Sequence, residues 1–328
     1  MTNRVLRWGL LSTARINRAL ITPLRASTRN QLAAVASRTR DKADAYAKEN
    51  NIPRAFGSYE AMLADPDIDV IYNPLPNHLH AAWTIKAAQA GKHVLCEKPL
   101  AIAVQEVDAM ADAAAACKVV VAEAFMYRHH PQTLKVKELL DNGAIGKLRV
   151  VKGAFTFNLT READVRLDPA MGGGSVWDVG CYPISYARTM VGTEPVEAFG
   201  WQVPGKTGVD ETFTGQLRFP GDVLAQFDCG FRAPFRAHME MVGSEGCITI
   251  PTPFRPGLNE TILLTRHDKT ESIATAGQEL YSGEVEDMAD AVLNGKAPRV
   301  TLADSRANVA AMLALLQSAR ERRVVRVS

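Results

Sequence analysis

The chain has 328 residues, 47% of them hydrophobic, and this length and apolar content predict two globular domains, each with its own core. Its 38 Lys and Arg nearly balance its 36 Asp and Glu, and no long run of one sign occurs, which argues against a nucleic-acid-binding protein and favours a small-molecule partner. The five cysteines are scattered, with no Cys-x-x-Cys pair, so free thiols in a reducing cytoplasm are expected rather than disulfides or a zinc site.

The first part of the chain alternates short apolar runs with helical segments. Strands are predicted at 6–11, 31–36, 70–72, 93–96 and 119–122. Helices are predicted at 15–25, 40–49, 59–63, 79–90 and 104–116. This alternation predicts a Rossmann-type, doubly wound parallel sheet, which binds ligands beyond the C-terminal ends of its strands. The first strand lacks the long apolar core of a signal peptide, and no run of about 18 apolar residues follows, so we expect a cytoplasmic protein without a membrane segment.

The pattern changes after residue 131. A helix there ends at Asn142-Gly143, and successive strands are then predicted at 148–158, 196–203, 211–219, 223–231, 238–242 and 248–250. A helical insertion at 175–190 interrupts them, and helices near 280–293 and 302–320 close the chain. We therefore predict an α/β protein with a nucleotide-binding domain at 1–124 and an α+β domain with a large, mostly antiparallel open sheet at 125–328.

The stretch GLLSTARIN follows the first strand, where a dinucleotide-binding protein carries its glycine-rich loop. Aligned on Gly-x-Gly-x-x-Gly, it offers Ser12, Ala14 and Asn17, all small residues. The Cβ of Ala14 narrows the approach to a phosphate, so the pattern alone fits a cofactor loop and an ordinary strand-to-helix turn equally well. In the first reading the cofactor-binding residues are Ser12, Thr13, Ala14, Arg15 and Ile16.

The end of the second strand favours the cofactor reading. Ser37 and Arg38 stand about 20 residues past the loop, where an NAD-binding protein places an Asp or Glu. A guanidinium there favours the 2′-phosphate of NADP, which makes NADP the expected cofactor. The alternative is that Arg38 and Arg40 are solvated surface charges.

A longer motif follows in NPLPNHLHAAWTIKAAQAGKHVLCEKPLA. It closely resembles the signature of the glucose–fructose oxidoreductase, inositol dehydrogenase and MocA-type (Gfo/Idh/MocA) family, and EAFMYRHHP, GGGSVWDVGCY and VGSEG fit the same family. The likeness is greatest to the branch with NADP-dependent D-xylose and glucose dehydrogenases and dimeric dihydrodiol dehydrogenase, where a Ser-Thr-Ala phosphate loop is familiar. The matching positions are Pro76, Asn77, His80, Gly91, Lys92, Glu97, Lys98 and Pro99.

The resemblance implies a cofactor and substrate site around Lys98, which follows a strand at its ligand-binding end, and a cis peptide before Pro99. An ammonium at Lys98 would orient the substrate hydroxyl; the alternative is a structural ion pair with Glu97. We expect further cofactor contacts from Leu75, Pro76, Asn77, His80, Glu97, Lys98 and Arg128. His129 and His130 would either touch ligand or be surface residues, and the spacing of His78 and His80 does not suggest a metal pair.

Asp178 and Tyr182 are four residues apart on the predicted 175–190 helix and so share a face, with Ser175 as an expected N-cap. The family motif implies that Tyr182 accepts the proton in oxidation and donates it in reduction. A free tyrosine has a pKa near 10, which Lys98 and the charge of the nicotinamide would lower. Gly180 within the helix indicates close approach of another element. The nearby aromatic residues, Trp177 and Tyr186, are expected to pack in the core.

These observations predict an NADP-dependent oxidoreductase that moves hydride between nicotinamide and the carbinol carbon of a sugar or cyclic diol, with Lys98, Asp178 and Tyr182 as catalytic and substrate-binding residues and no metal. The leading case is oxidation of an aldose such as D-xylose or D-glucose at C1 to the lactone. The alternatives are a keto-sugar reductase of the same family and a non-catalytic NADP-binding sensor. The resemblance also implies a homodimer or homotetramer formed through the C-terminal sheet.

Overall fold

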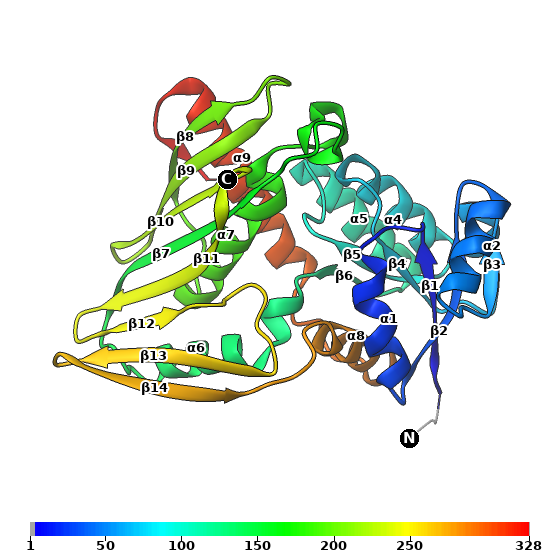
Figure 1. The fold of residues 1–328 in the computed structure, drawn as a ribbon, viewed down its shortest axis with the longest axis horizontal. Coiled ribbons are helices and arrows are strands. Elements are labelled where there is room, and N and C mark those ends of the chain that lie inside the picture. The colour runs from blue at the N-terminus through cyan, green and yellow to red at the C-terminus, as the bar shows by residue number, and fades with distance from the viewer. Residues whose placement is uncertain (1–3, 328) are drawn as a thin grey trace. The chain divides into compact units, whose positions relative to one another are not determined.

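The computed structural model describes residues 4–327, which form two compact units (Figure 1). The first unit takes the chain up to His129 together with Tyr281–Ser305. The second takes His130–Leu280 together with the chain from Arg306 onward. The expected division into 1–124 and 125–328 has a single boundary, whereas the structure has three, after residues 129, 280 and 305.

A six-stranded sheet forms the centre of the first unit, and all its hydrogen-bonded strand pairs are parallel, as predicted. Its order is β3-β2-β1-β4-β5-β6, with β1 (Leu6–Leu11), β2 (Asn30–Ala36), β3 (Arg54–Phe56), β4 (Val70–Asn73), β5 (His93–Glu97) and β6 (Val121–Ala124). The helices are α1 (Asn17–Ala26), α2 (Arg40–Glu49), α3 (Tyr59–Leu63), α4 (His80–Gln89), α5 (Val104–Cys117) and α8 (Ser282–Asn294), with short helices η1 (Asn77–Leu79) and η2 (Met126–His129). The strand order reverses between β1 and β4, and α/β sheets bind ligands at such a switch point.

Helix α8 belongs to the first unit because its apolar face completes that unit's core. Val285, Met288 and Ala289 are at most 1% exposed and pack with the apolar side chains of β1, β2 and α1. Burying a valine or methionine side chain stabilises a fold by roughly 1.5–3 kcal/mol. On the polar side of the helix, the Arg29 Nε donates to the Glu286 Oε2 at 2.8 Å. The segment is therefore fixed to this sheet by both apolar and charged contacts.

A nine-stranded sheet forms the second unit, in the order β14-β13-β12-β11-β7-β10-β9-β8-β15. Its neighbours are antiparallel except for β7 and β10. The strands are β7 (Leu148–Asn158), β8 (Glu197–Pro204), β9 (Asp210–Phe219), β10 (Val223–Gly230), β11 (Arg232–Gly243), β12 (Cys247–Ile250), β13 (Asn259–Arg266), β14 (Lys269–Ala276) and β15 (Val325–Arg326). The helices are α6 (Pro131–Asp141), α7 (Cys181–Val191) and α9 (Leu302–Glu321), with short turns η3 (Val165–Leu167), η4 (Pro169–Met171) and η5 (Val176–Gly180).

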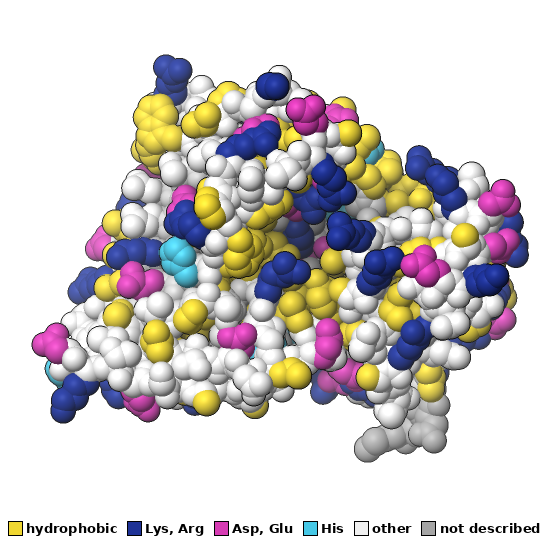
Figure 2. All heavy atoms as spheres, viewed as in Figure 1, with side chains coloured by type: hydrophobic (Ala, Val, Ile, Leu, Met, Phe, Trp, Pro, Cys, Tyr) yellow, Lys and Arg dark blue, Asp and Glu magenta, His cyan; other side chains and the backbone are white. Residues whose placement is uncertain are grey.

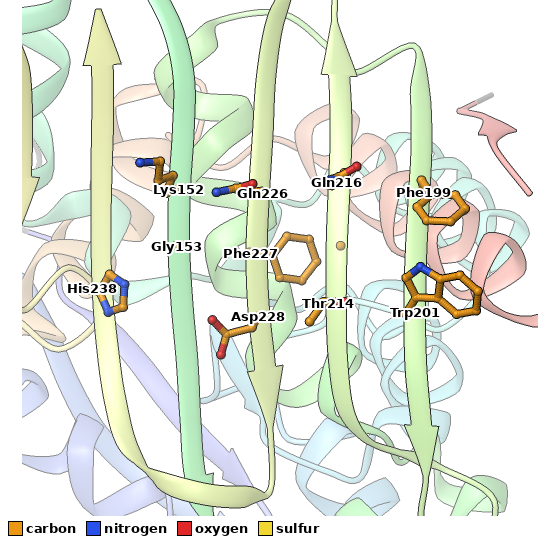
Figure 3. A pocket seen from close by; sticks show the side chains of 11 residues that line it. Lys152, Gly153, Phe199, Trp201, Thr214, Gln216, Gln226, Phe227, Asp228 and His238 are labelled. Atoms are coloured by element: carbon orange, nitrogen blue, oxygen red, sulfur yellow. The ribbon is translucent and has the colours of Figure 1, made fainter. Parts of the chain in front are cut away.

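The two faces of this sheet differ. On one face the glycines of β8 and β9 admit α9: a Cβ at Gly215 would meet Leu315 at 3.0 Å, and the Gly200 amide donates to the Ser318 hydroxyl at 3.1 Å. Along β9, buried and exposed side chains alternate, and the exposed ones lie on the other face. The outer side chains stand on the face away from the helices (Figure 3).

Four strands were not expected from the sequence: β3, β13, β14 and the two-residue β15. Strand β3 has only three residues, all partly exposed, so it lacks a buried apolar run. Strand β14 lies at the edge of the sheet beyond β13 and is mostly polar and exposed, and β13 buries only Ile262 and Leu264. A polar strand at a sheet edge carries little of the alternation by which strands are recognised. Within residues 4–327, none of the helices has the length and apolar character that crossing a membrane requires.

Candidate active site

The loop after β1 has the backbone of a glycine-rich turn although it has no glycine there. Ser12 has a φ of 119°, in the region that favours glycine. Its hydroxyl accepts from the Ala14 amide at 3.2 Å, and its carbonyl accepts from the Asn17 Nδ2 at 2.7 Å. Asn17, at the third glycine position, is fully buried. Serine therefore adopts the conformation of the first glycine, and asparagine braces the loop from the helix.

Helix α1 begins at the end of this loop. Ile16 is its N-cap and provides no side-chain cap for the first amides. At the end of the neighbouring strand β2, Ser37 is 5% exposed and its amide donates to the Phe56 carbonyl at 3.0 Å. The next residue, Arg38, is exposed. An open helix N-terminus beside an exposed guanidinium is a suitable environment for phosphate groups.

Lys98 follows β5 in a loop that is held from several sides. The Tyr72 hydroxyl donates to the Glu97 Oε1 at 2.5 Å, and the Lys98 amide donates to the Glu97 Oε2 at 3.2 Å. The buried Glu123 accepts from the Leu100 amide at 2.8 Å. The peptide bond between Lys98 and Pro99 is cis, as the family resemblance implied. The backbone that carries the Lys98 ammonium is therefore well defined.

His80 joins two of these loops and is 1% exposed. Its Nδ1 lies 2.8 Å from the Pro99 carbonyl oxygen and its Nε2 2.6 Å from that of Leu75. Burial lowers the pKa of His80 to about 4, while the two carbonyl oxygens oppose that shift. Both ring nitrogens already lie against protein carbonyls, so the imidazole acts on the loops of Leu75 and Pro99. Pro76 and Asn77, at the start of η1, are partly exposed.

Arg128, His129 and His130 are all buried, so the reading of the two histidines as surface residues is wrong. The Arg128 Nη1 donates to the Asp304 Oδ2 at 2.9 Å. Burial, with Arg299 and Arg128 nearby, lowers the pKa of His129 to about 3. The His130 Nδ1 accepts from the Gln132 amide at 3.1 Å and so caps α6. Arg128 and His130 thus make hydrogen bonds within the protein.

Asp178 lies in a π-helical turn, η5, which precedes α7. The sequence predicted one continuous helix over 175–190; π turns are uncommon and occur often at functional sites. The Asp178 amide donates to the Gly174 carbonyl at 3.1 Å. The Asp178 Oδ2 accepts from the Arg166 Nε at 2.7 Å, and the Arg166 Nη1 also donates to the Asp164 Oδ1 at 3.1 Å. Arg166 was not among the expected site residues, because no motif marks it.

Tyr182 lies on the first turn of α7 and is 6% exposed. Its ring centroid is 5.2 Å from that of Phe155 and 5.4 Å from that of Phe254. Such aromatic contacts fix the ring plane and leave the hydroxyl as the polar end of the side chain. Trp177 and Tyr186 are buried, as core residues would be.

The start of this helical segment is fixed by an aspartate from the sheet, and not by Ser175 as its N-cap. Ser175 makes no capping hydrogen bond; its hydroxyl donates to the Asp210 Oδ2 at 2.6 Å. The Val176 amide donates to the same oxygen at 2.8 Å. Close approach at Gly180 is confirmed, since a Cβ there would lie 2.9 Å from the Cys229 Sγ. Asp210 is distant in sequence from Ser175, and no local pattern points to their contact.

Comparisons with known proteins agree with this arrangement. Residues 6–125 match the family described as an oxidoreductase family with an NAD-binding Rossmann fold, and residues 133–249 match the GFO/IDH/MocA C-terminal domain. The chain is 36% identical to D-xylose 1-dehydrogenase (NADP(+)) 2 of Haloferax volcanii, over 95% of this chain and 97% of that protein. It is 34% identical to trans-1,2-dihydrobenzene-1,2-diol dehydrogenase of Bos taurus, over 76% of this chain and 75% of that protein.

A solved structure shows the same fold. The 3-ketoreductase KijD10 of Actinomadura kijaniata, in complex with NADP and TDP-benzene, superposes with a TM-score of 0.91 at 28% identity, covering 96% of this chain and 98% of that chain. The two family models together match residues 6–125 and 133–249 of this chain. The chain belongs to the Gfo/Idh/MocA family of oxidoreductases.

Proposed function

We propose that the protein is an NADP-dependent oxidoreductase that transfers hydride between the nicotinamide and a carbinol carbon of a sugar or cyclic diol. Oxidation of an aldose such as D-xylose or D-glucose at C1 to the lactone is the leading case. The observation that carries the proposal is that one chain combines a loop-fixed Lys98 with Asp178 and Tyr182 on consecutive helical turns. Relatives named for xylose oxidation and dihydrodiol oxidation support the substrate class.

In this proposal Lys98 and Asp178 hold the substrate hydroxyls. An ammonium and a carboxylate together supply donors and acceptors to neighbouring hydroxyl groups, as a polyol requires. The ion pair of Asp178 with Arg166 holds this carboxylate in one orientation. A substrate hydroxyl bound at Asp178 would therefore meet an acceptor that is already in position before the reaction.

Tyr182 moves the proton in the proposed reaction. During oxidation the carbinol hydroxyl would give its proton to the phenolate oxygen of Tyr182, and the carbon would give up its hydrogen with both electrons as hydride. During reduction the Tyr182 hydroxyl returns a proton to the new alkoxide. The bound nicotinamide supplies the hydride acceptor or donor. The Phe155 and Phe254 rings hold the tyrosine ring for this transfer.

NADP is the proposed cofactor because the first unit has donors for each phosphate. The uncapped N-terminus of α1 is suited to the pyrophosphate. The glycine-like φ of Ser12 lets the chain turn tightly between β1 and this helix. Arg38 is exposed at the end of β2 and is suited to the 2′-phosphate. The rest of the phosphate site would come from Thr13, Ala14, Arg15 and Ser37. The proposed residues near the nicotinamide half are Leu75, Pro76, Asn77, Glu97 and Arg128. His80 would fix the loops that carry Leu75 and Pro99.

Turnover assays with a substrate panel test the function. The purified protein is mixed with NADP and, one at a time, with D-xylose, D-glucose, other aldoses and cyclic trans-diols, and the absorbance of reduced nicotinamide is followed. We expect reduction of NADP with at least one aldose or diol. Reduction of a keto-sugar by NADPH without the reverse activity would favour the reductase alternative. Tight NADP binding without turnover on any of these compounds would favour the sensor alternative and contradict the enzyme proposal.

We infer a homodimer or homotetramer assembled through the face of the nine-stranded sheet opposite α7 and α9. Trp201, Val203 and Leu224 are 55%, 64% and 49% exposed. On the same face Phe199 and Trp201 line a hollow of about 410 Å³ together with Thr214 and Gln216 (Figure 3). Figure 2 shows hydrophobic side chains exposed over the region of β8.

The free cysteines agree with a cytoplasmic location.

Light scattering coupled to size-exclusion chromatography tests the assembly. The wild-type protein should elute with the mass of two or four chains. Trp201→Glu places a charge in the proposed contact and should yield a smaller species, whereas Leu134→Glu, at a partly exposed position on α6, should not. A monomeric wild-type protein would overturn the inference.

A further inference from the structure

Asp210 is a buried carboxylate that no step described so far uses. It opens strand β9, is 4% exposed, and accepts at one oxygen from both the Ser175 hydroxyl and the Val176 amide. Its other oxygen lies against Gly174, where a Cβ would come within 2.3 Å. Three consecutive residues at the start of the helical segment are therefore fitted to this one side chain.

The residues that follow in the chain are the ones proposed for chemistry. Asp178 is two residues beyond Val176 in the same π-helical segment, and its amide donates to the Gly174 carbonyl. Tyr182 is on the next turn. We propose, resting on the function above, that Asp210 is a positioning residue that acts on the reaction by fixing the first turn of the helical segment that carries Asp178 and Tyr182.

The rigidity of the anchor comes from the sheet. Asp210 pairs with Pro204 of β8, and the Phe231 amide donates to the carbonyl of the adjacent Glu211 at 2.8 Å. A carboxylate at the start of a helical segment also interacts favourably with the partial positive charge of the first amides. A turn held by a strand in this way has less freedom than one capped by its own serine.

The protonation state of Asp210 is part of this role. Burial raises the pKa of Asp210 to about 6, although its hydrogen bonds with Ser175 and Val176 oppose that shift. Beside it on β10 is the thiol of Cys229, whose pKa burial raises well above its usual value. The nearby charged groups have partners of their own: Asp178 pairs with Arg166, and Glu211 pairs with Arg232.

The pH dependence of the stability of the fold distinguishes a functional role of Asp210 from a purely structural one. Because the folded protein binds this proton more tightly than the unfolded chain does, the stabilisation is full below about pH 4 and is lost as the pH rises through 6. The ionised carboxylate therefore lowers the stability of the fold at neutral pH. A neutral isostere should make the fold more stable there and the reaction slower, a combination that a purely structural residue would not give.

The experiment compares Asp210→Asn, Asp210→Ala and Ser175→Ala with Asp222→Asn, the same change in the exposed turn between β9 and β10, where asparagine tolerates the positive φ. Full pH profiles of kcat, thermal unfolding at pH 8 and NADPH affinity are measured. The wild-type kcat should rise with pH through about 6. Asp210→Asn should lose that step, have a kcat at least about tenfold lower at pH 8, unfold at a higher temperature and keep its NADPH affinity. Ser175→Ala should move the step to higher pH because the carboxylate loses a donor.

A wild-type kcat and pH profile in Asp210→Asn would overturn the proposal. Hydrogen exchange gives a readout independent of turnover: the amides of residues 176–182 should exchange faster in Asp210→Ala and unchanged in the Asp222→Asn control. If the wild-type protein turns over none of the substrates, the proposed function fails and this exchange measurement decides the role of Asp210. Unaltered exchange at 176–182 in both Asp210 variants would then refute it.

Discussion

Arg166 and Asp178 form an ion pair, with the guanidinium Nε 2.7 Å from the carboxylate Oδ2. Asp178 raises the pKa of Arg166, with a second contribution from Asp164, and burial opposes the shift. The carboxylate proposed to bind substrate is thus held by a cation from a short helix that precedes it in the chain. In the proposed reaction the substrate would meet a charged pair and not an isolated acid.

Arg166→Met should therefore reduce kcat/KM by about tenfold to a hundredfold, since a hydrogen bond to a charged group contributes roughly 1.5–3 kcal/mol. Arg166→Lys should recover part of this loss because the charge remains while the fork geometry is lost. Steady-state kinetics with the best substrate provide the measurement. Arg161→Met is the matched control, since Arg161 is more exposed and lies 3.8 Å from Asp164. Equal kinetics in Arg166→Met and the control would remove Arg166 from the site.

Tyr182→Phe should lower turnover by about two to four orders of magnitude, the usual contribution of a general acid or base, while NADP affinity remains. Single-turnover absorbance and NADPH fluorescence titration measure the two quantities. Tyr186→Phe, one turn further along α7, removes a buried hydroxyl of the same kind and should keep most of the activity. Turnover close to wild type in Tyr182→Phe would show that the proton leaves by another group.

Arg38→Ala should weaken NADP binding by about tenfold to a hundredfold and leave NAD binding nearly unchanged, because only NADP has the 2′-phosphate. Dissociation constants for both dinucleotides, measured by fluorescence titration, give the ratio. Arg40→Ala is the control, since the Arg40 Nε is 2.8 Å from the Asp44 Oδ2 and is engaged on α2. A similar loss for both cofactors would indicate a general electrostatic effect and argue against recognition of the 2′-phosphate.

Ala14→Gly should preserve or improve NADP affinity, and Ala14→Leu should abolish it, if backbone and phosphate approach each other at this position. Ala26→Leu, at the exposed end of α1, controls for the effect of the larger side chain. Calorimetric titration with NADP measures all three. Retained affinity in Ala14→Leu would mean that the pyrophosphate lies elsewhere.

The sequence predicted the fold where local patterns and tertiary structure agree. The alternation of strands and helices predicted the parallel sheet. Ser12, which the sequence places at the first glycine position of the loop, has a glycine-like φ. The polar edge strand β14 was not predicted, because strand recognition relies on buried apolar faces, and the neighbouring β13 buries only Ile262 and Leu264.

The parts of the site that were missed are those made by contacts between distant segments. Arg166 and Asp210 are ordinary charged residues in sequence, and only the folding of 164–168 and of β9 against the π turn gives them a role. Ser175 had the local signature of a helix cap but donates to Asp210 instead. A cap can be predicted only if no outside acceptor competes for the same amide.

The return of α8 to the first unit makes that unit discontinuous in sequence. Val285, Met288 and Ala289 lie among side chains of β1, β2 and α1, so a fragment ending at His129 would leave this part of the core open to water. The two units cannot be separated by one cut or exchanged between relatives through one end-to-end fusion. A chimera that keeps both cores intact has to be joined at 129/130, 280/281 and 305/306 together.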